Sequence, residues 1–361
     1  MVPSKSTQII IHPSVVTTKP HYISLWNHNT GQLEFFVLSS NSNNGYKAFV
    51  LIGGFGRNNW TNPNKRYGNP ASDKQYLRIS INIIMHPTIP SADTLLYIYY
   101  FEGRISKDKE IVNENYLGTW EEDGFSFVFF TQPAEAIIDT LVAHNERLTL
   151  LDTYTMTYEQ WQGGKLEPIQ IGSFLISPPW FSPPAEEPST TLTLDPGVVF
   201  GNGLHPTTRD CLQAIDIACG GQKVSTMLDL GTGTGILALA AAARGCRRIL
   251  AVDCNFLATQ TARRNCLLND FGDRILAVQG QAEPFTAVAS DLLVANIHYD
   301  IMKGIIASPG FLQQKFFILS GLLTSEAAKV EDSLAALPVH ILKKWSRDHT
   351  WHTIFGITAA P

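Results

Sequence analysis

The sequence TMLDLGTGTGI at Thr226–Ile236 places a short apolar strand directly before three alternating glycines. Glycine has no Cβ atom and permits positive φ, so a ligand can approach the backbone of such a loop closely. The next segment, ILALAAAAR, has the composition of a helix and ends before Gly245, a residue typical of helix ends. This order of strand, glycine loop and helix predicts a site for an anionic or adenosine-bearing ligand at the start of the helix.

The spacing of the glycines separates two classes of ligand. A dinucleotide fingerprint reads GxGxxG and needs a glycine where this chain has Ile236. The pattern GxGxG preceded by Asp229 instead resembles motif I of the class I S-adenosylmethionine-dependent methyltransferases. A second strand, 248–252, leads into Asp253, whose carboxylate can accept hydrogen bonds from both hydroxyls of a ribose. The alternative is an ordinary glycine turn with Asp253 as a helix-start residue, and a dinucleotide oxidoreductase is disfavoured.

Length and composition restrict the class of protein. The 361 residues exceed one average domain, and a hydrophobic fraction of 44% with 16% charged residues is typical of globular proteins. A net charge of −5 argues against a primary nucleic-acid binder. The sequence has no apolar run long enough for a membrane span, and its start lacks the pattern of a signal peptide. We therefore expect a cytoplasmic protein without membrane or direct nucleic-acid partners.

The cysteines indicate reduced thiols rather than a metal site. None of the five forms a CxxC pair, and all lie in the glycine-rich half of the chain: Cys211, Cys219, Cys246, Cys254 and Cys266. We expect no metal, and buried thiols of a reducing compartment.

The C-terminal part, 194–361, alternates strands and helices, which indicates an α/β fold with a parallel sheet. A helix is expected over 255–270 with Asn255 as its N-cap, followed by strands at 274–278, 291–295 and 316–320. Strands at 339–345 and 351–358 are separated by the short polar loop SRDHT and read as an antiparallel hairpin. A Rossmann-like sheet closed by such a hairpin is the architecture of class I methyltransferases.

The N-terminal side is less regular. Residues 91–160 predict a small α+β domain with strands at 94–103, 124–130 and 148–158 and an amphipathic helix at 133–144. Residues 161–193 include SPPWFSPPAEEP, and this proline density predicts a semi-rigid linker rather than part of a sheet. Residues 1–90 are an unassigned extension, β-rich or poorly ordered, whose GGFG at 53–56 is interpreted as a turn because no lysine or helix pattern follows.

A second motif indicates which family of methyltransferases the chain resembles. The run VVFGNGLHPTT at 198–208 precedes a helix and again places glycines where a ligand could approach the backbone. Together with the first glycine loop it resembles the methyltransferase of large-subunit ribosomal protein eleven, the PrmA family. The resemblance covers residues 154–361 and includes PIQIGSFLISPPW at 168–180, ANI at 295–297 and LSGLL at 319–323. The family carries a ferredoxin-like recognition domain before its catalytic domain, and residues 91–160 match it in part.

This resemblance implies transfer of methyl groups from S-adenosylmethionine to amino nitrogens of a protein substrate, either a lysine ε-amino or an N-terminal α-amino group. A large-subunit ribosomal protein is the acceptor that the family implies, and another protein or a small amine is the alternative. The cofactor-binding residues carried over from the family are Asp229, Gly231, Thr232, Gly233, Gly235, Asp253, Gly201, His205, Thr207 and Thr208.

By the same likeness Asn296 is the catalytic residue, beside the methyl group that is transferred. A sulfonium is already an activated donor, so the enzyme chiefly has to align a neutral amine with it. An Asn side-chain oxygen can accept an N–H bond from the amine without supplying the opposite charge that would keep the amine protonated. His298 could contact the substrate or simply start a helix, and Tyr299 could stack on a planar substrate or pack in the core.

Overall fold

The structure is a computed structural model. It describes residues 90–105, 111, 113–122, 124–181, 190–221 and 223–359, together with the backbone of four short strands before residue 90. The chain divides into two compact units, Met1–Ile84 with Val278–Gly280, and Met85–Ala277 with Gln281–Pro361. In the first unit two pairs of strands are antiparallel, β1 (Trp26–Asn27) with β2 (Gln32–Leu33) and β3 (Tyr46–Leu51) with β4 (Tyr76–Ile81). The GGFG sequence at 53–56 lies outside the described residues.

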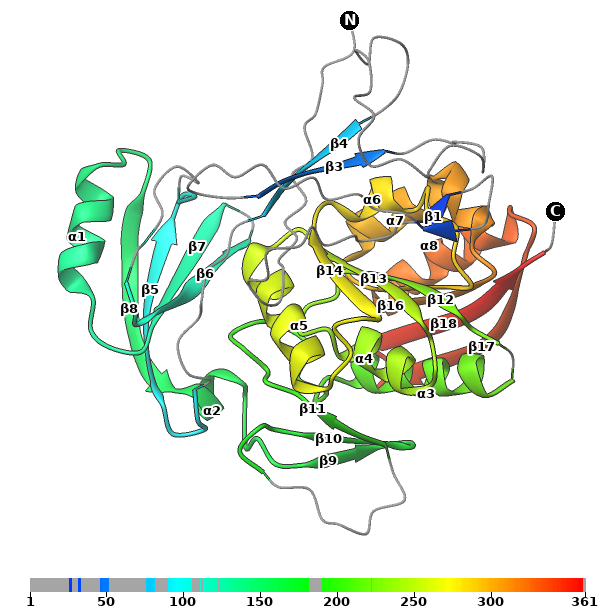
Figure 1. Cartoon of the computed structure of the whole chain (residues 1–361), viewed down its shortest axis with the longest axis horizontal. Helices are drawn as coiled ribbons and strands as arrows, with labels where there is room; N and C mark the ends of the chain where they lie inside the picture. The colour runs from blue at the N-terminus through cyan, green and yellow to red at the C-terminus, as the bar shows by residue number, and fades with distance from the viewer. Residues whose placement is uncertain are drawn as a thin grey trace, which may run out of the picture. The chain divides into compact units, whose positions relative to one another are not determined.

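A seven-stranded sheet forms the centre of the C-terminal half, with the strand order β14-β13-β12-β15-β16-β18-β17 (Figure 1). Its strands are β12 (Thr226–Leu230), β13 (Arg248–Asp253), β14 (Ile275–Gln279), β15 (Leu292–Asn296), β16 (Phe316–Leu323), β17 (Val339–Arg347) and β18 (Trp351–Thr358). β12 pairs in parallel with β13 and β15, and β15 with β16, whereas β18 is antiparallel to both β16 and β17. Open α/β sheets bind ligands at the carboxyl ends of their central strands, which here are β12, β13 and β15.

The helices of this half are α3 (Pro206–Gly221), α4 (Ile236–Ala243), α5 (Phe256–Leu268), α6 (Ala282–Phe285), α7 (Tyr299–Ala307) and α8 (Thr324–Ala335), with the 3₁₀ helix η1 (Pro309–Gln313). One buried cluster joins α3 and the alanine-rich α4 to the sheet. The predicted N-cap of α5 is confirmed, because the Asn255 side chain accepts a hydrogen bond from the Leu257 N–H. Within the described residues, no helix combines the length and the apolar character needed to cross a lipid bilayer.

The small domain is a four-stranded antiparallel sheet with the order β6-β7-β5-β8. Three of its strands and its helix fall where they were predicted, β5 (Leu95–Glu102), β7 (Phe125–Phe130), β8 (Thr149–Thr157) and α1 (Glu135–Ala143). The edge strand β6 (Tyr116–Glu122) was not predicted. Helix α1 covers one face of the sheet, where Ile138 and Leu141 pack with Tyr99 and Phe101.

The expectation that 161–193 form no sheet is wrong. Strand β9 (Ile169–Ile171) pairs antiparallel with β10 (Phe174–Ser177), which pairs in parallel with β11 (Thr190–Thr193). The prolines do not prevent this, because the sequence PPWFSPP follows β10, and β10 itself is buried. The helix α2 (Tyr158–Trp161) connects β8 to this segment.

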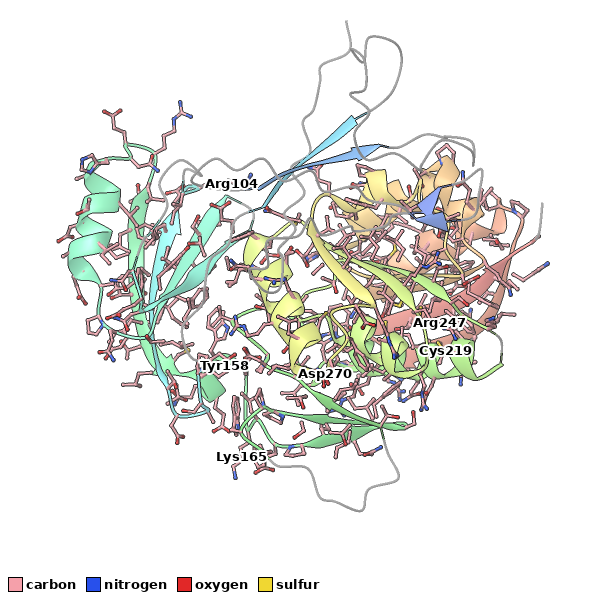
Figure 2. All side chains as sticks on the ribbon, in the orientation of Figure 1. Arg104, Tyr158, Lys165, Cys219, Arg247 and Asp270 are labelled. Atoms are coloured by element: carbon pink, nitrogen blue, oxygen red, sulfur yellow. The ribbon has the colours of Figure 1, made fainter. Side chains whose placement is uncertain are left out.

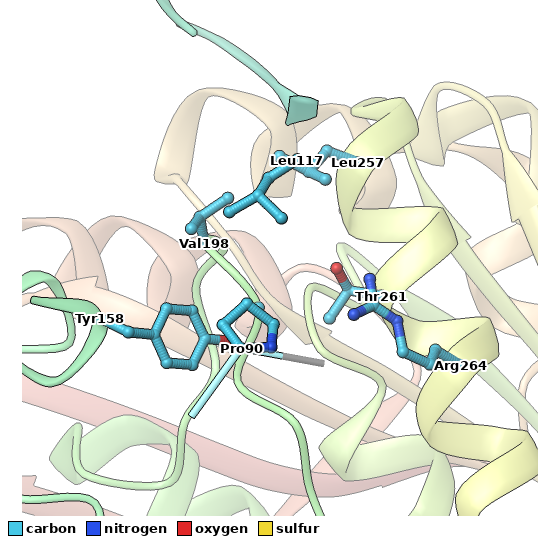
Figure 3. Close-up of a pocket in the computed structure, with 8 residues that line it drawn as sticks. Pro90, Leu117, Tyr158, Val198, Leu257, Thr261 and Arg264 are labelled. Carbon is cyan, nitrogen blue, oxygen red and sulfur yellow. The ribbon is translucent and has the colours of Figure 1, made fainter. Parts of the chain in front are cut away.

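The second face of the small sheet packs against the domain that contains the seven-stranded sheet. Leu96, Ile98 and Phe129 share a buried cluster with Val198 and Leu257. A small pocket of about 20 Å³ lies along this seam, lined by Pro90, Leu117, Tyr158, Gly197, Val198, Leu257, Thr261 and Arg264 (Figure 3). It has room for about one water molecule, far less than a nucleoside cofactor needs.

A buried carboxylate holds the two domains together at this seam. Asp195 accepts hydrogen bonds from the Tyr158 hydroxyl and the Arg264 guanidinium, both at 2.7 Å. Asn265 donates to the Asp195 carbonyl at 2.8 Å and to the Thr234 carbonyl at 2.9 Å. Residues of the small domain, of α5 and of the glycine loop therefore belong to one connected network.

Candidate active site

The glycine loop between β12 and α4 folds over the carboxyl end of β13. The backbone N–H groups of Gly231 and Thr232 donate to the Val252 carbonyl at 2.8 and 3.0 Å. Gly231 and Gly233 both have positive φ, and a Cβ atom at either position would collide with the Ile297 side chain or the Phe200 carbonyl, respectively. The loop therefore requires glycine for its conformation and for its close neighbours.

The second motif lies against the first. The Thr234 N–H donates to the Phe200 carbonyl at 3.1 Å, and the Thr234 hydroxyl donates to the Gly201 carbonyl at 2.7 Å. The chain then enters α3, whose first turn contains the buried Thr207 and Thr208. The Nδ1 atom of His205 lies 2.7 Å from the Thr207 hydroxyl. The structure thus brings together the two loops that the sequence carries about 25 residues apart.

Two buried carboxylates border the glycine loop. Both oxygens of Asp253 accept backbone hydrogen bonds, Oδ2 from Gly233 at 3.0 Å and Oδ1 from Asn255 at 2.9 Å. The Oδ2 atom of Asp229 accepts a bond from the Thr232 hydroxyl at 2.6 Å, while its Oδ1 atom is buried without a hydrogen-bond partner within the described part of the chain. Burial raises the pKa of Asp229 to about 7, and the nearby Asp253 charge acts in the same direction.

Asn296 ends β15 at the same edge of the sheet. It lies opposite Ser320 of β16 and is half-buried. Its side-chain amide makes no hydrogen bond to any residue that the structure describes. The neighbouring strand β16 has an irregularity between Ser320 and Leu322, and its Gly321 lies so close that a Cβ atom there would be 3.1 Å from Asn296 Oδ1. The amide of Asn296 is therefore available to a ligand at the edge of the glycine loop.

The sequence of the chain matches the model of a known protein family. A family model described as "Ribosomal protein L11 methyltransferase (PrmA)" matches residues 128–358. The chain belongs to the PrmA family. As a member it is a methyltransferase, and the match covers the glycine loop, the Gly201–Thr208 loop and Asn296.

Relatives of this PrmA chain carry the same description. A ribosomal protein L11 methyltransferase of Carboxydothermus hydrogenoformans is 28% identical over 294 residues, which are 75% of this chain and 95% of the relative. One of Synechococcus elongatus is 37% identical over 202 residues, but the match spans only 64% of its length and 51% of this chain. A solved ribosomal protein L11 methylase of Lactobacillus delbrueckii subsp. bulgaricus is 28% identical with a TM-score of 0.47, covering all of that chain and 54% of this one.

The two residues after Asn296–Ile297 begin helix α7 in this PrmA chain. His298 is the N-cap residue of α7, and its exposed ring lies 3.5 Å from Glu122 of β6, measured from Nε2 to Oε1. Tyr299 is the first residue of α7, and the ammonium groups of Lys303 and Lys329 lie 5.9 and 5.4 Å from its ring centre. His298 therefore stands at a helix start and Tyr299 lies among side chains of α7 and α8, while a contact of either residue with the substrate stays a prediction.

Two aromatic residues of the site were missed by the sequence analysis. The His205 ring is edge-on to Phe200, with ring centres 5.5 Å apart, and to Trp351, at 4.8 Å. Burial lowers the pKa of His205, which favours the neutral ring. Phe200 directly precedes Gly201 and so had a local signal, whereas Trp351 begins β18, about 150 residues away in sequence. These rings lie against one another beside the Gly201–Thr208 loop, where Phe200 remains exposed.

Proposed function

We propose that this protein transfers methyl groups from S-adenosylmethionine to lysine ε-amino or N-terminal α-amino groups of ribosomal protein L11. The observation that carries the proposal is the position of Asn296 beside a glycine loop that has two buried carboxylates, in a chain of the PrmA family. A ribosomal substrate would place this activity in the cytoplasm.

The described residues fit the cofactor. The glycine loop offers backbone without Cβ atoms, and Asp253 retains acceptor capacity for the ribose hydroxyls beyond its two backbone bonds. The buried oxygens Asp229 Oδ1 and Thr208 Oγ1 have no partner among the described residues and suit the methionine end. When bound, S-adenosylmethionine supplies a methyl group already activated by its sulfonium charge. Gly201, His205, Thr207 and Thr208 belong to the loop that we expect to cover it.

Asn296 orients the acceptor in this proposal. Its side-chain oxygen accepts an N–H bond from the neutral amine, so the nitrogen lone pair is aimed at the methyl group. The rings of Phe200, His205 and Trp351 give the site an apolar border, and apolar surroundings disfavour the charged ammonium.

Cofactor binding should depend on the protonation of Asp229. The pKa of Asp229 is about 7 in the folded protein and near 4 in the unfolded chain. Between these pH values the folded state holds a proton that the unfolded state has lost, so this group increases the stability of the fold as the pH falls from about 7 to about 4. A cationic ligand favours the ionised carboxylate, so affinity for S-adenosylmethionine should rise between about pH 6 and pH 8, with release of a proton on binding near pH 6.5. Calorimetry in two buffers of different ionisation enthalpy measures this proton. In Asp229→Asn the release should disappear; an unchanged release in the variant would contradict the assignment.

A labelled-methyl assay tests the function. Purified ribosomal protein L11 and a whole-cell extract are each incubated with the enzyme and methyl-labelled S-adenosylmethionine. We expect label on L11, in acid-stable linkage to amino groups. The alternative candidate, another protein or a small amine as acceptor, is not favoured, because a relative described as a ribosomal protein L11 methyltransferase matches 75% of this chain. Label in another protein or in a small amine, with none in L11, would favour that candidate.

A further inference from the structure

The face of the small sheet that packs on the catalytic domain continues beyond the contact. Residues paired across antiparallel strands lie on the same face. Trp120 pairs with Phe127, Phe127 with Tyr100, and Tyr100 with Asp152, so these four form one row across the sheet. In the next row Glu122 pairs with Phe125, and Phe125 with Glu102. We call these seven residues the aromatic–acidic face.

The rings of this face are partly exposed. Tyr100 stacks on Phe127 with ring centres 4.5 Å apart and planes 15° apart, and Phe125 lies 5.5 Å from Tyr100. In the adjoining row, Ile98 and Phe129 are buried in the cluster that they share with Leu257. The apolar surface therefore extends from the buried seam toward solvent. The two ends of the sheet can be followed in Figure 2, which labels Tyr158 beside the start of β5 and Arg104 beyond its end.

The charges on this face have one sign. Glu102, Glu122 and Asp152 are all exposed, and no basic residue stands at the paired positions of the two rows. Carboxylates beside aromatic rings favour an ammonium group, because both the charges and the ring faces attract a cation. The same charges repel the phosphates of a nucleic acid.

The face leads to the candidate active site. The Trp120 indole N–H donates to Glu122 Oε2 at 3.3 Å, and Glu122 Oε1 lies 3.5 Å from His298. His298 follows Asn296 by two residues. Near the other end of β6, Gly118 lies against the Leu257 side chain so closely that a Cβ atom would collide with it. The last residue of β6, Glu122, therefore lies beside His298, which stands two residues after the residue that we expect to orient the acceptor.

We propose that the aromatic–acidic face docks a lysine-bearing segment of the protein acceptor, which rests on the function proposed above. The aliphatic stems of lysine side chains lie over the rings, and their ammonium groups pair with Glu102, Glu122 and Asp152. The segment then runs along β6 toward Asn296. This surface selects a cationic protein segment rather than a free small amine, because it extends across several rows of the sheet.

Binding of purified ribosomal protein L11 to the full chain, with S-adenosylhomocysteine present, tests the proposal. Glu102→Lys and Asp152→Lys change exposed residues outside the cofactor site, and Asp139→Lys makes the same change on α1, which covers the other face. The double variant Glu102→Lys/Asp152→Lys should raise the Kd for L11 about tenfold at low salt, and less at 0.5 M salt. Asp139→Lys should stay within about twofold, and cofactor affinity and thermal stability should be unchanged in all variants.

Three results would overturn the docking surface: no binding of L11 to the unmodified chain, an unchanged Kd in the double variant, or equal weakening by Asp139→Lys. A different result separates the two proposals. If L11 binds with the predicted dependence on Glu102 and Asp152 but receives no methyl group, the docking surface stands and the methyl-transfer function fails. If the double variant methylated L11 with an unchanged KM, the docking surface would be contradicted and the methyl-transfer function would stand.

Discussion

Replacing Gly233 by alanine is expected to abolish measurable cofactor binding, whereas the same replacement at Gly245 should leave it nearly unchanged. Both glycines have positive φ, +56° and +92°, so both variants carry the same kind of backbone strain, about 1 kcal/mol. Their surroundings differ. The added Cβ atom at Gly233 collides with the Phe200 carbonyl, while at Gly245 no atom lies within 4 Å.

The collision at Gly233 acts on both loops of the site. The Phe200 carbonyl accepts the Thr234 N–H, so relief of the clash must separate the glycine loop from the Gly201–Thr208 loop. Several hydrogen bonds and the backbone approach to the cofactor would be lost, which we expect to raise the Kd for S-adenosylmethionine by at least about 100-fold. Overpacking should also lower the free energy of unfolding by about 1–3 kcal/mol.

Calorimetric titration with S-adenosylmethionine and thermal unfolding measure the two effects. Gly245→Ala provides the matched control, because it isolates the strain of a positive φ at the C-terminal end of the same helix. If folded Gly233→Ala bound the cofactor within about threefold of the unmodified protein, the cofactor would not lie on the glycine loop.

The elements around this loop could be predicted because their signals are local. A strand, three glycines and an alanine-rich helix follow one another within about 20 residues, and the structure places β12, the loop and α4 at those positions. Asn255 was predictable as an N-cap for the same reason, since a capping side chain acts on the N–H group two residues later.

The elements that were missed depend on partners distant in the sequence. Strand β6 contains Gly118 and ends in two glutamates, a weak strand pattern, and it is stabilised by pairing with β7 and by contact with Leu257. The sheet of β9, β10 and β11 was obscured by prolines that follow β10. Trp351 lies at the site only because β18 pairs with β16. Trp351, the first residue of β18, stands opposite Leu323, the last residue of β16.

The structure adds protein partners to Asp253 that the sequence does not indicate. It is the last residue of β13, where the sequence predicts a ribose-binding acid, and each of its oxygens also accepts a backbone N–H, from Gly233 and from Asn255. The carboxylate therefore shapes the glycine loop and starts α5, whatever else it binds. Sequence spacing predicts that an acid stands there, but the protein partners of its oxygens follow only from the fold.

Asn296→Ala should lower kcat about 100- to 1,000-fold and leave the Kd for S-adenosylmethionine nearly unchanged. The variant removes the acceptor that aims the amine, which is an effect on the transition state. Asn296→Asp should also be slow, because a carboxylate in this place favours the protonated ammonium, which has no lone pair to donate.

Asn269→Ala is the matched control for this prediction. The Asn269 side chain joins the end of α5 to the Thr193 backbone. It donates to the Thr193 carbonyl at 2.6 Å and accepts from the Thr193 N–H at 2.9 Å. Loss of this side chain should therefore lower thermal stability. The kcat of folded Asn269→Ala should remain within about twofold of the unmodified protein, because the residue lies at the far end of α5 from the site. Single-turnover methyl transfer and calorimetry measure the two constants separately. If Asn296→Ala lost cofactor affinity in proportion to its loss of rate, Asn296 would be a cofactor ligand, and the acceptor amine would be oriented by another group.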